Sequence, residues 1–204
     1  AAAKDLGVDL MVSDAQNDSS TQQNQAQNAQ SQGAKAVIIN PVDSDAASPA
    51  VAPLLSSSLP VISVDRSVTG EDVTSHIASD NVAGGAQAAD ELAKAVGEKG
   101  KVIILQGTPG AASTRDRGDG FKKEIKKYSG IEVVAEQTAN FDRAEALDVT
   151  TNLMQSNPDV VGIYAENDEM ALGAIQSLGS KAGADVKIFG FDGTEDGLKA
   201  VSNG

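Results

Sequence analysis

The stretch KVIILQGTPGAASTRDRGDGFKKEIKKYSGIEVV (101–134) decides the fold class. It contains two short apolar runs rich in Val and Ile, VIIL (102–105) and IEVV (131–134), and the FKKEIKKYSG (121–130) between them has a helical composition. Strand and helix alternating at this spacing indicate a βαβ unit, whose two strands lie parallel.

The same alternation continues in both directions along the chain. Further apolar runs are DLMV (9–12), AVII (36–39), VISV (61–64), VVGIY (160–164) and VKIF (186–189), and stretches of helical composition, such as 81–97, 143–157 and 169–180, lie between them. Near-continuous apolar strands are typical of a parallel sheet covered on both faces. The sequence therefore predicts an α/β fold in which parallel sheets are flanked by helices.

One irregularity in this alternation predicts a division into two lobes. The interval between 61–64 and 102–105 is the longest, and it contains SHIASDN (75–81), which reads as a short extra strand followed by a helix. We therefore expect an N-terminal lobe over 1–79 and a C-terminal lobe over 80–204. The Gln/Asn-rich segment 16–33 could be a disordered tract, but the strand spacing across it favours a polar surface helix.

Composition excludes several classes of function. The 204 residues include no cysteine and a single histidine, His76, so disulfides, thiol catalysis, His-rich metal sites and a Ser-His-Asp triad are not expected. The formal net charge of −13 argues against binding to nucleic acid or to anionic membrane surfaces. The segment 192–203 superficially resembles a calcium loop, but Asn203 stands where the bidentate glutamate belongs. We expect no metal, no cofactor and no catalytic residues.

Polar and aromatic side chains follow most of the predicted strands. Ligands of parallel α/β sheets bind beyond the carboxyl ends of the strands, so these side chains are candidates for one binding site. They are Asn40, Asp65, Arg66, Gln106, Arg115, Arg117, Phe141, Asp142, Arg143, Glu166, Asn167, Asp168, Phe191 and Asp192. Carboxylates, amides and guanidinium groups form charge-assisted hydrogen bonds with hydroxyl groups, and a phenylalanine can stack on the apolar face of a ring. The set suits a polyhydroxylated ligand such as a sugar.

Each candidate also has a purely structural interpretation. Asp65 and Arg66 could form a surface pair, Arg117 could be solvated, and Phe141 could belong to the core. Asn81, Asp168 and Thr194 could cap the helices that follow them. Carboxylates such as Asp65, Asp168, Glu169 and Asp192 could form the acid–base pair of a glycosidase, but the sequence gives no distance between them. The agreement of many strand ends favours a binding site.

Several motifs resemble, in order along nearly the whole chain, those of the ribose-binding proteins of bacterial ABC importers. They are INPVDSDA (39–46), PVISVDR (60–66), SHIASDN (75–81), LQG (105–107), RDRGDGF (115–121), NFDRAEAL (140–147), ENDEMALGA (166–174) and GFDGTEDG (190–197). The resemblance implies a two-lobed type I periplasmic-binding-protein fold and a non-enzymatic protein that closes on ribose by a hinge motion. It further implies a monomer outside the cytoplasm, periplasmic or lipid-anchored, that delivers the sugar to a membrane permease.

The resemblance also assigns site residues. The family's Asp-Arg pair falls on Asp65 and Arg66, its cross-cleft arginine on Arg117, its stacking phenylalanine on Phe141, its amide on Asn167 and its late aspartate on Asp192; Asn40 and Ser79 complete the expected set. An effector domain of a sugar-responsive transcription repressor shares this fold and remains the alternative. The family's first strand, with an Asn and two phenylalanines, precedes residue 1, and its later elements follow Gly204, so we expect a chain incomplete at both ends.

Overall fold

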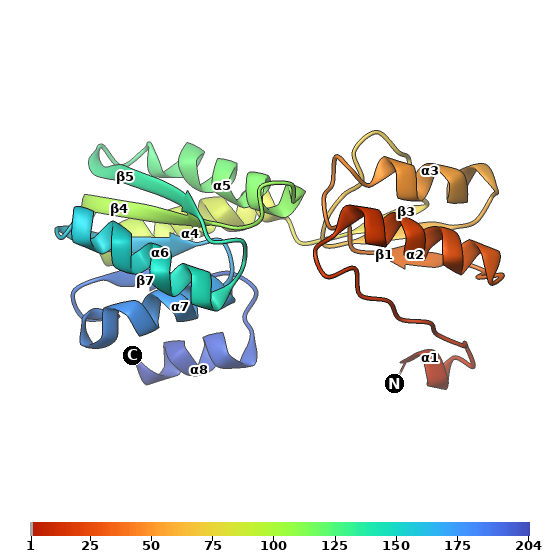
Figure 1. Ribbon diagram of the computed structural model, residues 1–204. Helices are drawn as coiled ribbons and strands as arrows, with labels where there is room; N and C mark the ends of the chain where they lie inside the picture. The colour runs from red at the N-terminus through yellow and green to blue at the C-terminus, as the bar shows by residue number, and fades with distance from the viewer. Residues whose placement is uncertain (1) are drawn as a thin grey trace. The chain divides into compact units, whose positions relative to one another are not determined.

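Both halves of the chain fold into a parallel β-sheet with helices packed against it, which confirms the predicted α/β class. The computed structural model describes residues 2–204 (Figure 1). The chain divides between Ala78 and Ser79 into two units, Ala1–Ala78 and Ser79–Gly204. Each unit is described by itself below.

The first unit is built on a three-stranded sheet of order β1-β2-β3, in which both pairs are parallel. Its elements are α1 (Ala2–Asp5), α2 (Ser19–Ser31), β1 (Val37–Ile39), α3 (Ser48–Ser56), β2 (Val61–Val64) and β3 (Ser75–Ile77). Ile39 and Val61 from the strands form one core cluster with Ala26 from α2 and with Val51 and Leu54 from α3. The helices α2 and α3 therefore cover one face of this sheet.

The Gln/Asn-rich segment is a helix, as the strand spacing favoured. Asp18 caps α2, because its carboxylate accepts a hydrogen bond from the main-chain N–H of Thr21. Ala26 is the one buried residue of this helix. A helix that buries so little apolar surface depends on such polar contacts for its position.

Two expectations for the first unit are wrong. The run DLMV (9–12) forms no strand, and the side chains of Leu10, Met11 and Val12 are exposed. A strand needs a neighbour for its N–H and C=O groups, and no strand within residues 2–204 pairs with this segment. The sheet is also not covered on both faces, since Ile38 and Ile77 are exposed at 65% and 62%.

The second unit has a four-stranded parallel sheet of order β5-β4-β6-β7. Its strands are β4 (Lys99–Gln106), β5 (Gly130–Thr138), β6 (Val160–Ala165) and β7 (Lys187–Phe189). Its helices are α4 (Asn81–Ala95), α5 (Ala112–Ile125), α6 (Arg143–Ser156), α7 (Asp168–Leu178), the 3₁₀ turn Gly179–Lys181 and α8 (Glu195–Asn203). These elements match the apolar runs and helical stretches of the sequence.

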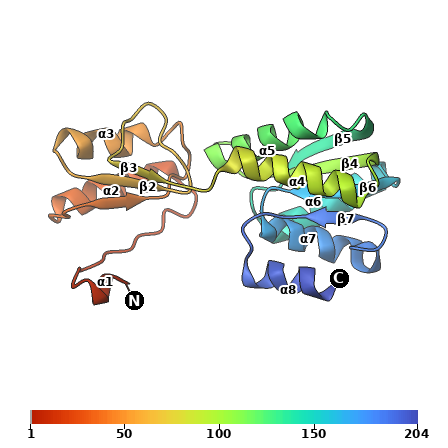
Figure 2. The ribbon, with the colours of Figure 1, turned by 180° about the vertical axis from the view of Figure 1, so that it is seen from behind.

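Helices cover both faces of this second sheet, as the apolar strands predicted. Along β4, Val102 and Ile104 pack in a cluster with α4 and α5, whereas Ile103 and Leu105 pack with α6 and α7. Figure 2 shows α4 and α5 in front of the strands, and Figure 1 shows α6 and α7 on the other side. In the sheet, β5 lies on one side of β4 and β6 lies on the other. The strand order therefore reverses at β4. Binding crevices of α/β sheets form at the carboxyl ends of strands beside such a reversal.

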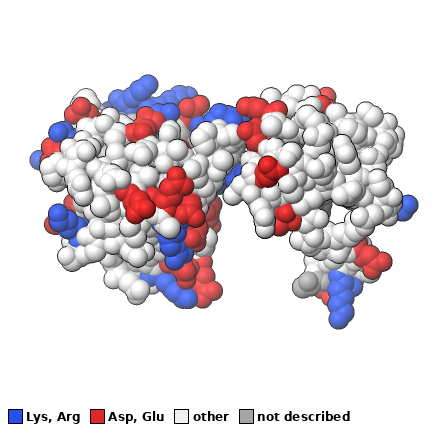
Figure 3. Space-filling model, viewed as in Figure 1, with Lys and Arg blue, Asp and Glu red and all other residues white. Residues whose placement is uncertain are grey.

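Charged side chains are scattered over the surface of both units, with acidic ones gathered on part of the face of the second unit that Figure 3 shows. Several form exposed ion pairs, such as Lys94 with Glu91 and Lys101 with Asp159. Exposed pairs of this kind contribute little to stability. Within residues 2–204, no helix combines the length and the apolar character that crossing a membrane requires.

Candidate functional site

Arg117 on α5 is the centre of the polar cluster in the second unit. Its side chain is buried; its Nε donates to Asn81 Oδ1 at 2.8 Å and its Nη1 donates to the main-chain oxygen of Glu166 at 2.6 Å. The ring of Phe191 lies under the guanidinium group, 3.8 Å from Cζ. The alternative of a solvated Arg117 is therefore wrong, and the guanidinium group is held in one orientation.

Asp192 lies in the turn between β7 and α8, beside the guanidinium group of Arg117. Its Oδ1 lies 3.5 Å from Arg117 Nη1. The turn is fixed by Asp168, whose Oδ2 accepts hydrogen bonds from the N–H and the hydroxyl of Thr194 at 2.7 and 2.9 Å. The structure thus brings together two candidates that the sequence separates widely, and Asp168 positions one of them.

The helix caps differ in part from the sequence-based alternatives. Thr194 caps α8 as expected, since its hydroxyl accepts from the N–H of Gly197. However, Asp80 caps α4 instead of Asn81, and Asn167 caps α7 instead of Asp168. Asn167 Oδ1 accepts from the N–H of Met170 at 2.9 Å, which leaves the amide nitrogen of this candidate to donate to a ligand.

Phe141 lies at the loop after β5, beside the carboxyl end of β4. Its ring contacts Gly107, where a Cβ would overlap the ring. The side chain is half-buried and packs against the core cluster of α6 and α7, so Phe141 is partly core and partly available for stacking. Ser79, the remaining candidate in this unit, is exposed directly before the Asp80 cap.

The first unit holds the other three candidates at the carboxyl ends of β1 and β2. Asn40 Nδ2 lies 3.5 Å from Asp65 Oδ2, and Arg66 Nε lies 3.7 Å from the same oxygen. Arg66 Nη1 also donates to the main-chain oxygens of Pro41 and Val42, at 3.2 and 2.9 Å. Arg66 therefore fastens the loop after β1 to the loop after β2, and it pairs with Asp65 as the surface-pair alternative expected.

Backbone strain marks three of the candidate residues independently of any motif. Asp65, Phe141 and Asp192 have positive φ angles of 61°, 61° and 93°. This region is sparsely populated by residues other than glycine and costs about 1–3 kcal/mol per residue. Five other non-glycine residues among 2–204 also have positive φ, namely Gln16, Asn17, Ser58, Glu98 and Asn140, so the strain agrees with a binding role for the loops after β2, β5 and β7 without identifying it.

Gln22 is a positioning residue that sequence reasoning missed. Gln22 lies on α2. Its amide nitrogen donates to the main-chain oxygen of Asn40 at 2.8 Å, and its amide oxygen accepts from the main-chain N–H of Val42 at 3.0 Å. This pair of bonds holds the loop that carries Asn40. Nothing in the run QNDSSTQQNQAQNAQSQG (16–33) distinguishes this glutamine from its neighbours.

We expect Gln22→Ala to weaken the binding of a ligand at Asn40 by about 1 kcal/mol, because two loop groups lose their fixed partner and the loop with Asn40 gains freedom. Calorimetric titration with the sugar measures the change. Gln23→Ala, a neighbouring substitution of the same type, serves as the control and should leave the affinity unchanged. Equal affinities of the two variants would contradict the positioning role of Gln22.

No group of three or more His, Cys, Asp or Glu side chains that could hold a metal ion occurs within residues 2–204. His76 Nδ1 lies 2.7 Å from Ser63 Oγ, across the β2–β3 pair. The two clusters instead offer carboxylates, amides, guanidinium groups and aromatic rings. Such groups bind hydroxyl groups and the apolar faces of sugar rings.

Parallel α/β units with these polar clusters at their strand ends define a protein that binds a small polar solute. The chain belongs to a family with this fold, since the family described as "Periplasmic binding protein domain" matches residues 1–204.

Known relatives agree with this assignment. The chain is 46% identical over 202 residues to the ribose import binding protein of Salmonella typhimurium, with 99% of this chain and 68% of that protein covered. It is 42% identical over 201 residues to the ribose import binding protein of Bacillus subtilis, with 98% and 65% covered. The crystal structure of the Caulobacter myo-inositol binding protein bound to myo-inositol matches with a TM-score of 0.93 and 37% identity, over 98% of this chain and 70% of that one. The resemblance to ribose-binding proteins is confirmed, and these matches do not support the repressor alternative.

Proposed function

We propose that this protein binds ribose outside the cytoplasm and delivers it to the membrane permease of an ABC importer. The observation that carries the proposal is the buried Arg117 with Asp192 beside it and Phe191 beneath it. A buried guanidinium group next to a partly exposed carboxylate offers strong donors and acceptors to one hydroxylated ligand. The identity of 46% to a ribose import binding protein supports ribose as the sugar.

In this proposal each unit supplies residues that bind sugar hydroxyl groups. Asp65 and Asp192 accept hydrogen bonds from sugar hydroxyls, whereas Arg66, Arg117 and Asn167 donate to them. Phe141 stacks on the apolar face of the ring, and Asn40 and Ser79 add polar contacts. Asp65 has 45% of its side chain exposed and Asp192 36%, so both carboxylates are accessible to a ligand.

The two units, which we propose as the two lobes, then act by closing on the ligand. A sugar that binds both lobes stabilises the closed state by the difference between its affinities for the closed and the open state. The closed form docks on the permease as a monomer, without a cofactor and without chemical change of the sugar. The protein works in a periplasm, or is held on the outer side of the membrane by a lipid anchor.

Titration calorimetry with a panel of sugars tests the proposal on the protein at its natural length. We expect ribose to bind with a submicromolar Kd, and xylose, glucose and myo-inositol to bind at least about tenfold more weakly, a difference of about 1.4 kcal/mol. Tighter binding of another sugar would contradict ribose but retain a sugar-binding function. Absence of binding to every sugar would contradict the function itself.

A further inference from the structure

Glu166, at the carboxyl end of β6, is a fully buried acid that the proposed ligand contacts do not use. Its Oε2 accepts hydrogen bonds from the N–H of Gly107 at 2.8 Å and from the hydroxyl of Thr114 at 2.6 Å. Its Oε1 is buried and has no hydrogen-bond partner among residues 2–204. A buried polar atom without a partner is rare in folded proteins and calls for an explanation.

The same residue holds Arg117 through its main chain. The main-chain oxygen of Glu166 accepts from Arg117 Nη1, while its carboxyl group fastens the loop after β4 and the first turn of α5, the helix that carries Arg117. Gly118 closes the carboxyl site from α5, since a Cβ at this position would stand 2.8 Å from Oε1. Glu166 therefore holds Arg117 directly through its main-chain oxygen, and indirectly through its carboxyl contacts to the start of α5.

The surroundings of the carboxyl group favour its protonated form. Burial raises the pKa of Glu166 to about 7, although the hydrogen bonds from Thr114 and Gly107 and the charges of Arg117 and Lys122 on α5 oppose this shift. Burial and the charge of Glu166 raise the pKa of Tyr164, two residues earlier on β6, so its hydroxyl stays neutral in these surroundings. The proton on Glu166 is thus gained and lost near neutral pH.

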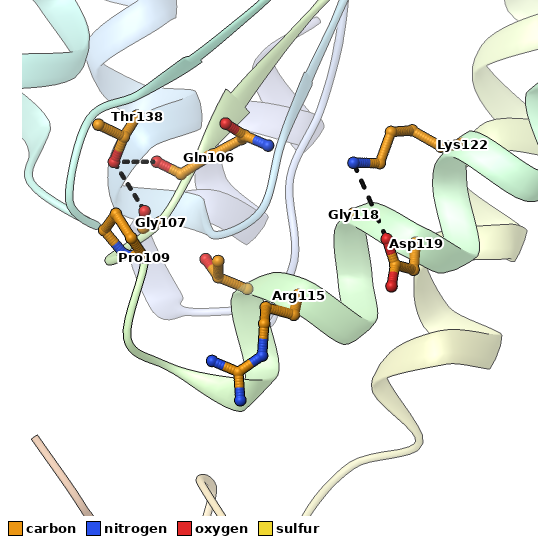
Figure 4. Close-up of a pocket in the computed structure, with 9 residues that line it drawn as sticks. Gln106, Gly107, Pro109, Arg115, Gly118, Asp119, Lys122 and Thr138 are labelled. Carbon is orange, nitrogen blue, oxygen red and sulfur yellow. Dashed lines mark hydrogen bonds and ion pairs between the residues drawn. The ribbon is translucent and has the colours of Figure 1, made fainter. Parts of the chain in front are cut away.

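A cavity lies close to this carboxyl group. A pocket of about 280 Å³ lies between the ends of β4 and β5 and the start of α5, and Figure 4 shows its lining residues. Three of them, Gly107, Thr114 and Gly118, also contact the Glu166 carboxyl group. The acid therefore lies behind one wall of this pocket without lining it.

We propose that Glu166 is a positioning residue for Arg117, and that the proton on Glu166 couples the affinity for the sugar to pH near neutrality. This inference rests on the proposed function. A sugar bound at Arg117 excludes water from this end of the sheet, which disfavours the ionised carboxylate further. The charge of Arg117 lowers the pKa of Glu166, and a sugar that binds the guanidinium group weakens this opposing effect. The protonated form therefore binds the sugar more tightly.

The experiment compares ribose affinity between pH 5.5 and 8.5 in the wild-type protein and in Glu166→Gln. The glutamine keeps an acceptor for Gly107 and Thr114 and resembles the protonated acid. We expect the wild-type affinity to fall about three- to tenfold as the pH rises, which corresponds to a pKa increase on binding of roughly 0.5–1 unit. Glu166→Gln should keep the affinity of the acidic wild-type protein at every pH.

Glu136→Gln is the matched control. Glu136 is an exposed carboxylate at the rim of the same pocket, where it contacts Gln106 and Lys122, and its substitution should leave the wild-type pH profile in place. A wild-type profile that persists in Glu166→Gln would overturn the proposal. So would an equal flattening of the profile by both substitutions.

Unfolding without sugar provides a second readout that does not depend on the proposed function. The folded protein holds the Glu166 proton more tightly than the unfolded chain does, because the pKa of the folded state is raised. The stability that the proton on Glu166 contributes is therefore fully present below about pH 4.5, and it is lost as the pH rises through about 7. The denaturant midpoint of the wild type should fall over this range more than that of Glu166→Gln.

The two readouts separate the possible failures. Equal midpoint profiles of the wild type and Glu166→Gln would overturn the titration of Glu166. A difference in the midpoint profiles with a pH-independent ribose affinity would overturn the coupling to the sugar site. If no sugar bound the wild type at any pH, the proposed function would fail, and the coupling would fail with it.

Discussion

Replacing Arg117 with alanine is expected to weaken ribose binding by about 2–4 kcal/mol, a loss of roughly 30- to 1000-fold in affinity. The guanidinium group is buried and bonded to Asn81 and to the main-chain oxygen of Glu166. Its removal leaves these acceptors, the Asp192 carboxylate and the bound sugar hydroxyls without their donor. Titration calorimetry with ribose on the protein at its natural length measures the change.

Arg115→Ala is the control for this substitution. Arg115 lies two residues earlier on α5 and is exposed, so its replacement removes the same charge without opening the Arg117 site. We expect an effect on ribose affinity below about 0.5 kcal/mol. Similar, small losses from the two substitutions would remove Arg117 from the binding site.

The second large effect is expected from Gly85→Val, which should lower the free energy of unfolding by about 3 kcal/mol. The helices α4 and α5 cross at main-chain contact: a Cβ on Gly85 would overlap the main-chain oxygen of Arg117, and a Cβ on Gly120 would overlap that of Val82. A side chain at Gly85 can be accommodated only if the helices move apart, because a main-chain group has no alternative rotamer. Urea denaturation measures this loss, and ribose affinity should fall with it because α5 carries Arg117.

Ala83→Val separates this steric effect from the general cost of a β-branched residue in a helix. Ala83 lies on the same helix but is exposed, so valine there should cost less than about 1 kcal/mol. If both substitutions lowered the free energy of unfolding equally, the close approach of α4 and α5 would not be important for stability.

The sequence was sufficient for the elements whose signal is local. Apolar runs such as VIIL (102–105) predicted strands in the second unit, because a strand buried on both faces must be apolar along its length. The run 9–12 has a similar composition, but a strand also requires a neighbour, and the sequence does not show which runs become neighbours. Composition therefore identified strand candidates without showing which of them would pair.

The residues of the candidate site also differ in how far the sequence predicts them. Asp65 and Asp192 could be predicted because Asp65 directly follows β2 and Asp192 lies in the turn after β7. Glu166 and Phe191 also follow predicted strands, but their contacts to Arg117 join groups far apart along the chain. Gln22 makes such a contact to the main-chain oxygen of Asn40. Such contacts have no counterpart in spacing or composition, so the roles of Glu166 and Phe191, and any role of Gln22, emerged only from the three-dimensional arrangement.

The contacts around Arg117 bear on the entropy of binding. A free arginine side chain samples many rotamers, and fixing such a side chain on association costs roughly 0.5–1.5 kcal/mol. Here Asn81, the carbonyl of Glu166 and the ring of Phe191 restrict those rotamers before any ligand arrives. The side-chain entropy of Arg117 is therefore lost during folding and not during binding. A sugar that reaches this arginine meets a preorganised donor, so more of the hydrogen-bond energy remains as affinity.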